Sequence, residues 1–142
     1  MPTRVLVPLD DSELSMRALD HALDRWADAE LTALHVIDPL DVVYGAEVGG
    51  LSGGEAWHDA AKEAAEDLFD RAREEATAAG VDLRTETVVG SPGPAIVEYV
   101  TDHDVDHVVM GSHGRSGLSR LFLGSVAERV LRRAPAPVTV IR

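Results

Sequence analysis

The sequence contains no cysteine and a single lysine, Lys62, among its 142 residues. Without cysteine, the chain can hold neither a disulfide nor an iron–sulfur cluster nor a thiolate zinc site. Lys62 lies in a predicted helix, so the lysines that a P-loop and a protein kinase require are both missing. The dinucleotide fingerprint G-x-G-x-x-G is also absent.

Long apolar runs are absent as well. No stretch approaches the roughly 20 apolar residues of a membrane span, and the N-terminus lacks the basic and apolar regions of a signal peptide. We therefore expect a soluble cytoplasmic protein without a membrane partner. Its 142 residues predict a single domain, residues 1–142, with room for a hydrophobic core.

Basic residues are few and unevenly placed. The formal net charge is -12, which separates into -17 for residues 1–106 and +5 for residues 107–142. An acidic chain argues against nucleic acid as a partner, and the basic end indicates a small anion. Many acids with almost no lysine suggest adaptation to high salt, because salt screens the self-repulsion of a carboxylate surface.

Apolar runs and amphipathic stretches alternate along the chain. The strands are predicted at residues 4–9, 31–37, 83–89, 106–110 and 138–141. The helices are predicted at about 12–28, 55–79 and 92–103, with a last helix opening at Gly124-Ser125. This alternation predicts an α/β fold with an open, doubly wound, five-stranded parallel sheet covered by helices on both faces.

In such a sheet the ligand lies beyond the carboxyl ends of the strands. There the sequence places Asp10-Asp11, Ile37-Asp38, Gly90-Ser91 and Met110-Gly111. Asp11 or Ser12 is expected to cap the first helix, and Gly80 to end the second. In the last helix Val126, Val130 and Leu131 are expected to face inward.

The histidines form no metal-ligand spacing, so we expect no metal site from the protein alone. His35 is interpreted as a packed, hydrogen-bonded histidine, whereas His103 and His107 have no obvious partner. A magnesium ion bridging ligand phosphates remains a separate possibility.

Two apparent motifs are rejected. Gly50–Gly54, "GLSGG", matches the nucleophile elbow, but no strand precedes Ser52, and the segment belongs to the 17-residue loop 38–54. Asp10-Asp11 is similar to the acidic pair of phospho-receiver domains, yet the third strand ends in Val89-Gly90 instead of an aspartate.

The segment after the fourth strand carries the sharper signal. Gly111 and Gly114 follow the end of this strand, where the chain must turn sharply. Glycine permits a positive φ there and lets backbone N–H groups approach an anion closely. Ten residues later Gly124-Ser125 opens a helix, whose free N–H groups bind phosphate. One end of the segment can thus hold a sugar or base and the other the phosphates.

Gly111-Ser112-His113-Gly114, nine residues and then Gly124-Ser125 give G-x2-G-x9-G-[S/T]. This pattern resembles the ATP-binding signature of universal stress proteins. The stretches "VLVPLDDSELSMRALDHAL", "LTALHVID", "VVGSPGPAIVEYV" and "HVVMGSHGRSGLSRLFLGSVAERVLRRAPAPVTVIR" resemble the same family in order. The resemblance covers essentially the whole chain and includes all the signature glycines.

The resemblance implies an adenine nucleotide alpha hydrolase-like fold with strand order 3-2-1-4-5. It implies a stress-response module that binds ATP, or a related adenine nucleotide, with or without magnesium. It also implies a homodimer that pairs through the edge strand Val138–Ile141. By position, the nucleotide-binding residues would be Pro8, Leu9, Asp10, Val36, Met110, Gly111, His113, Gly114, Arg115, Gly124, Ser125 and Val126. Asp10 would bind the ribose, Gly124–Val126 would bind the phosphates, and Arg115 or Arg120 would replace a phosphate-binding lysine.

Two alternatives stay open. The same site could belong to a slow ATPase or phosphotransferase, although no residue reads as an activated base and no lysine is placed for phosphoryl transfer. The chain could instead be a dimeric interaction module that binds no nucleotide, against which the intact glycines weigh. An unidentified protein partner is compatible with each function.

Overall fold

The structure is a computed structural model that describes residues 2–40, 55–113 and 123–142. Several sequence-based predictions fall outside these ranges. They concern the glycine-rich loop with Ser52, the turn residue Gly114, and the two candidate phosphate ligands Arg115 and Arg120.

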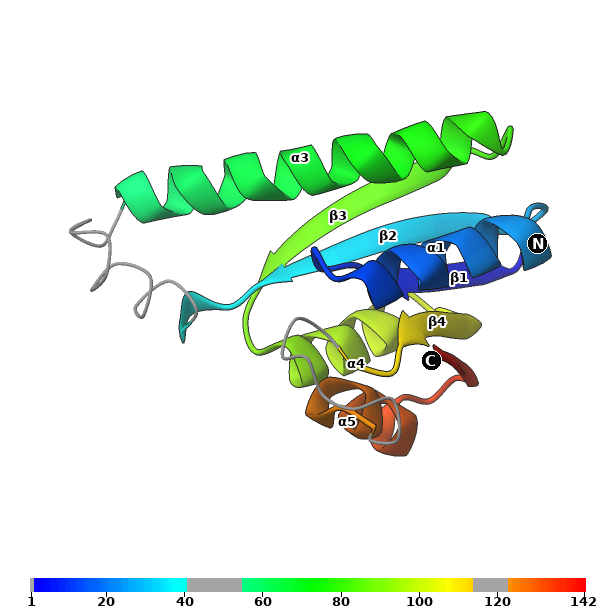
Figure 1. The fold of residues 1–142 in the computed structure, drawn as a ribbon. Coiled ribbons are helices and arrows are strands. Elements are labelled where there is room, and N and C mark those ends of the chain that lie inside the picture. The colour runs from blue at the N-terminus through cyan, green and yellow to red at the C-terminus, as the bar shows by residue number, and fades with distance from the viewer. Residues whose placement is uncertain (1, 41–54, 114–122) are drawn as a thin grey trace.

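The described residues form one five-stranded parallel sheet in the order β3-β2-β1-β4-β5 (Figure 1). Its strands are β1 (Arg4–Pro8), β2 (Glu30–Ile37), β3 (Leu83–Val89), β4 (His107–Gly111) and β5 (Val138–Ile141). The helices are α1 (Glu13–Arg25), α3 (Glu55–Ala78), α4 (Pro92–Asp102) and α5 (Ser125–Arg133). The predicted α/β fold and strand order are confirmed.

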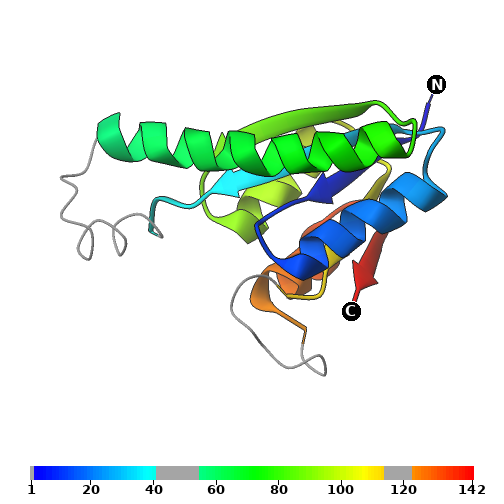
Figure 2. The ribbon, with the colours of Figure 1, turned by 45° about the horizontal axis from the view of Figure 1, so that its top comes forward.

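Helices cover both faces of the sheet. On one face α1 and α3 lie over Val5, Val7 and Ala33 of the sheet. Phe69 of α3 is buried in the same cluster. On the other face α4 and α5 cover Leu6, Leu34 and Val108 (Figures 1 and 2). Central strands buried on both sides explain the continuous apolar runs of the sequence. In the described ranges no helix is long and apolar enough to cross a membrane.

The helix ends follow local chemistry. The Ser12 hydroxyl accepts a hydrogen bond from the Ser15 N–H at 3.2 Å, so Ser12 is the N-cap of α1. Gly80 follows α3 with φ of 70°, the left-handed conformation that glycine adopts without strain. The predicted end of α1 near residue 28 was too late, because the helix ends at Arg25. The next residue, Trp26, packs its ring against His107, with the two ring centroids 4.7 Å apart.

Three side chains differ from their prediction. Leu131 is 42% exposed, because the buried side of α5 carries Ala127 and Val130 and Leu131 lies off that side. His107 does have partners, the Thr139 hydroxyl at 2.7 Å from Nε2 and the Trp26 ring. Its burial, with His21 as a second cause, lowers the pKa of His107. His103 stacks on Tyr99 with ring centroids 3.8 Å apart.

The contact between α1 and α3 carries an unfavourable charge pair that predicts a stabilising substitution. Repulsion from Asp20 of α1, and a hydrogen bond with it, raise the pKa of Glu75 on α3 above its ordinary 4.5. A raised folded-state pKa means that ionised Glu75 costs stability, and the cost disappears as pH falls through that pKa. Glu75→Gln should therefore raise the midpoint of thermal unfolding at pH 7 and have little effect below pH 4.5.

Glu74→Gln is the matched control, because Glu74 is the smallest of the named causes acting on Glu75. It removes the same charge from the same helix. An equal gain from both variants, or a gain from Glu75→Gln that persists in acid, would contradict the pairing of Asp20 with Glu75.

Candidate functional site

Leu9 and Asp10 follow the central strand β1. The main-chain hydrogen bonds of Leu9 go to β2, and those of Asp10 go to α1. The Leu9 N–H donates to the Leu34 carbonyl at 2.8 Å, and the Leu9 carbonyl lies 2.8 Å from His35 Nδ1. A carbonyl only accepts, so Nδ1 of His35 carries the proton in this bond. His35 is thus packed and hydrogen-bonded as predicted, and it holds the exit of β1 in place.

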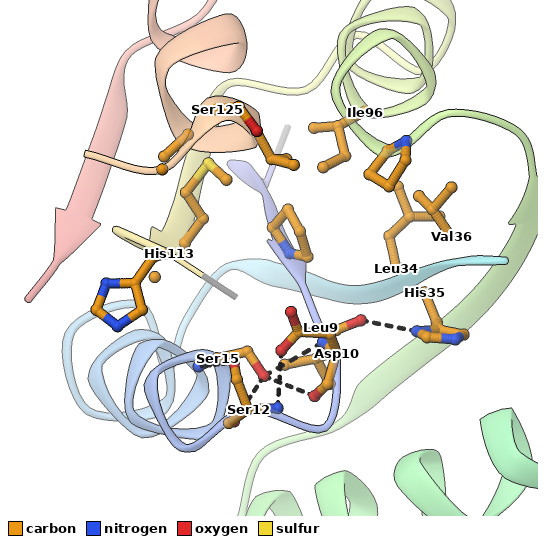
Figure 3. A pocket seen from close by; sticks show the side chains of 17 residues that line it. Leu9, Asp10, Ser12, Ser15, Leu34, His35, Val36, Ile96, His113 and Ser125 are labelled. Carbon is orange, nitrogen blue, oxygen red and sulfur yellow. Dashed lines mark hydrogen bonds between the residues drawn. The ribbon is translucent and has the colours of Figure 1, made fainter. Parts of the chain in front are cut away.

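Asp10 comes next and turns its side chain toward the crevice. Its Oδ1 accepts a hydrogen bond from the Ser12 N–H at 2.8 Å, while the second carboxylate oxygen points into the open space (Figure 3). Its main-chain N–H and carbonyl both bond to the hydroxyl of Ser15. The acid that follows β1 is therefore anchored before any ligand arrives.

Strand β4 leaves the sheet beside β1, at the point where the strand order reverses. A Cβ on Gly111 would lie 3.0 Å from the Leu14 Cβ and 3.2 Å from its carbonyl carbon. Gly111 is thus required by the close approach of α1, and it does not use the positive φ that glycine permits. Beyond it Ser112 is buried, and its hydroxyl lies 3.3 Å from His113 Nδ1.

Helix α5 begins directly against this exit. The Gly124 N–H donates to the Ser112 carbonyl at 2.6 Å, and a Cβ on Gly124 would lie 3.0 Å from both that oxygen and the His113 Cα. Gly124, the N-cap residue of α5, makes no side-chain capping bond, and in the described ranges no other side chain is seen to cap this helix. The Glu128 N–H makes the first intrahelical bond to Gly124, so the N–H groups of residues 125–127 have no partner within the helix.

These segments enclose a cavity of about 580 Å³, a size typical of small-molecule sites. Asp10 and Ser125 lie on opposite sides of it, and Leu34, Val36 and Ile96 line the wall between them (Figure 3). The remaining lining residues are Pro8, Leu9, Ser12, Ser15, His35, Pro92, Met110, Gly111, His113, Gly124, Val126 and Ala127. The cavity is thus apolar on the side of β2 and α4 and polar at its two ends.

The structure brings together all the predicted nucleotide-binding residues that it describes. Ten of them line the cavity: Pro8, Leu9, Asp10, Val36, Met110, Gly111, His113, Gly124, Ser125 and Val126. Gly114 and Arg115 lie outside the described ranges. Within those ranges no three histidine or acidic side chains are grouped to hold a metal ion.

The expectation that the ligand lies beyond the carboxyl ends of the strands placed the cavity-lining residues of β2 too far along the chain. It named Ile37-Asp38, whereas Leu34, His35 and Val36 line the cavity. The register explains the difference, because Pro8 at the end of β1 lies beside Leu34, and β2 continues for three more residues. Those later residues pair with β3, up to Ile37 opposite Val89.

Ser15, Ile96 and Pro92 were missed. Ser15 stands at the third position of α1, and Pro92 and Ile96 belong to the first turns of α4. The available signal was the order of the elements, because helices that follow β1 and β3 begin at the carboxyl edge of the sheet. Which of their residues face the crevice depends on how the helices pack.

Comparison with known proteins agrees with this geometry. The model of the universal stress protein family matches residues 1–142. The chain belongs to this family. Universal stress protein MJ0531 of Methanocaldococcus jannaschii is 34% identical over 98% of this chain and 81% of its own length. MJ0577 of the same organism has a solved structure with 31% identity and a TM-score of 0.81, covering 99% of this chain and 96% of that one.

A further structural relative was solved in complex with cAMP. It is a universal stress protein with 28% identity and a TM-score of 0.74, covering 99% of this chain and 97% of its own. Nucleotide binding therefore occurs in a family member of the same fold and nearly the same extent.

Proposed function

We propose that this universal stress protein binds ATP, or a closely related adenine nucleotide, and acts as a nucleotide-dependent regulatory module in the stress response. The observation that carries the proposal is the cavity at the β1–β4 switch point. It combines an apolar wall, an anchored carboxylate and a helix N-terminus whose N-cap residue, Gly124, has no capping side chain. The cAMP complex of a relative supports the same ligand class.

The three parts match the three parts of a nucleotide. The base lies between Val36 and Ile96 on the apolar side, and the ribose hydroxyls donate to Asp10. The phosphates accept hydrogen bonds from the N–H groups at the start of α5 and from the Ser125 hydroxyl. Arg115 and Arg120 remain predicted phosphate ligands.

Helix α5 is the better phosphate site of the two helices that begin at the cavity. Helix α4 starts with Pro92 and Pro94, which have no N–H, and the Ala95 N–H already donates to the Ser91 carbonyl. Helix α5 has no proline in its first turn and offers three N–H groups to one anion. The phosphates therefore lie at α5.

Magnesium enters the proposal as part of the ligand. Among the cavity-lining residues that the structure describes, Asp10 is the one acidic side chain, and none is a lysine or an arginine. Polyphosphate charge is then balanced by magnesium carried on the phosphate oxygens, by the α5 dipole and by the predicted arginines. We place binding ahead of turnover, because none of the described hydroxyl groups that line the cavity is paired with a histidine; the hydroxyl that lies beside His113, that of Ser112, is buried and is not part of the lining.

A single domain that pairs as a homodimer through β5 completes the proposal. The two core clusters lie on the two faces of one sheet, which supports a single domain. Strand β5 is an edge strand whose four residues are all half-buried, and pairing with a second copy would cover its free main-chain groups.

Nucleotide released from the purified protein tests the proposal. Protein purified in high salt with magnesium is denatured, and the released small molecules are identified by mass spectrometry. We expect an adenine nucleotide, and we expect titration calorimetry of the emptied protein to detect ATP binding. Intact ATP after long incubation supports a binding module, whereas steady release of phosphate would favour the ATPase. No binding of ATP or AMP would overturn the proposed function.

A further inference from the structure

One buried hydroxyl holds both main-chain groups of Asp10. Ser15 Oγ accepts a hydrogen bond from the Asp10 N–H at 3.2 Å and donates to the Asp10 carbonyl at 2.7 Å (Figure 3). The Ser12 carbonyl lies 3.1 Å from the same hydroxyl and shares its proton. Ser15 is only 5% exposed, so water does not readily replace these bonds.

The hydrogen bonds differ from an ordinary helix cap. In a capping box, the side chain at the third helical position bonds back to the N–H of the N-cap residue. Here the third position is Ser15, but the Ser12 N–H is bonded by Asp10 Oδ1 instead. The Ser15 hydroxyl is therefore available to hold Asp10, two residues before the cap.

We propose that Ser15 is a positioning residue of the cavity, which fixes the main chain of Asp10 so that its carboxylate meets the vicinal hydroxyl groups of a ribonucleotide. This inference rests on the proposed function. With the Oδ1–Ser12 bond, the Ser15 hydroxyl restricts Asp10 on both sides of its Cα. The carboxylate is then preorganised for the ligand, and little ordering is needed when the ligand binds.

The role makes a specific demand on the ligand. Asp10 acts through the ribose hydroxyl groups of the ligand. If Asp10 is displaced, the affinity for ATP should therefore fall, whereas the affinity for 2′,3′-dideoxy-ATP, which lacks these hydroxyl groups, should hardly change. Hydrogen bonds to a charged group contribute roughly 10- to 100-fold in affinity. A general loss of fold would instead weaken both nucleotides, since they share the base and the phosphates.

Binding of both nucleotides to the wild type and three variants provides the test. Ser15→Ala removes the hydroxyl, and Ser15→Cys keeps a side chain there that bonds only weakly, in case the alanine variant does not fold. Ala22→Gly is the matched control, because it weakens α1 at a fully buried position outside the cavity. Dissociation constants are measured by calorimetry in high salt with magnesium.

We expect the wild type to prefer ATP over dideoxy-ATP by about tenfold or more. In both Ser15 variants the dissociation constant for ATP should rise about tenfold, while that for dideoxy-ATP changes less than about twofold. Ala22→Gly should keep the wild-type preference. An unchanged preference in the Ser15 variants, or equal losses for both nucleotides, would overturn the role of Ser15.

The two proposals fail in different ways. Equal affinity of the wild type for both nucleotides would contradict a role of Asp10 and Ser15 in ribose recognition, but it would not contradict nucleotide binding. Failure of the wild type to bind either nucleotide would instead overturn the proposed function.

Discussion

Gly124→Ala is expected to weaken ATP binding at least tenfold and to destabilise the protein at the same time. The added Cβ would lie 3.0 Å from the Ser112 carbonyl oxygen and from the His113 Cα, both of which are main-chain atoms. Neither can rotate away, so the first turn of α5 must move. Overpacking of this kind costs about 1–3 kcal/mol, and displaced N–H groups lose charge-assisted bonds that contribute about 1.5–3 kcal/mol each.

Comparing ATP with adenosine separates the two effects. Adenosine lacks phosphates, so its dissociation constant should change much less than that of ATP. Gly90→Ala is the matched control: it makes the same change near the carboxyl edge of the sheet, where the one described atom that the new Cβ would meet is Ala95 Cβ, at an ordinary contact distance of 3.7 Å. Normal ATP binding by Gly124→Ala, or equal losses for ATP and adenosine, would contradict phosphate binding at α5.

The same glycines show what the sequence could and could not predict. Their spacing located the switch point correctly, because the pattern lies between the fourth strand and the last helix. The packing that requires them was not predicted. Gly111 is needed because Leu14 packs against it, and Gly124 because it packs against Ser112 and His113. Such contacts depend on how α1 and α5 pack, which no local pattern records.

Partners across the sheet were unpredictable for the same reason. His107 bonds to Thr139 on the neighbouring strand and contacts Trp26 at the end of α1. The α/β order and every strand were predictable, because apolar runs and amphipathic helices alternate without ambiguity. The residues that form the wall of the cavity were not predictable, since they depend on the register between β1 and β2, which places Leu34 beside Pro8.

Removing salt is expected to have the largest effect on stability. A net charge of -12 lies on 142 residues. The same charge is confined to a compact sphere in the folded state and spread over a larger volume in the unfolded chain. Self-repulsion is therefore stronger in the folded state and lowers the free energy of unfolding. The repulsion is about 5 kcal/mol larger at 10 mM salt than at 1 M. Native proteins have only about 5–15 kcal/mol of stability in total.

Surface ion pairs oppose this effect, because salt weakens them too. Glu30 pairs with Arg4 at 3.4 Å and with Arg84 at 3.1 Å, and Arg132 pairs with Glu128 at 3.0 Å. The charged groups are partly or largely exposed, and such pairs contribute about 0–1 kcal/mol each. Net repulsion therefore prevails, and the melting temperature should rise by about 10–20 °C between 10 mM and 1 M potassium chloride.

Removing charge should reproduce part of the effect of salt. Glu63, Asp67 and Glu74 are exposed on α3, and replacing all three by the corresponding amides lowers the net charge to -9. Self-repulsion grows with the square of the charge, so the triple variant should lose about two fifths of the salt dependence. Calorimetric melting at several salt concentrations measures both slopes. Equal slopes for the wild type and the variant, or a wild type more stable in dilute buffer than in molar salt, would refute self-repulsion as the cause.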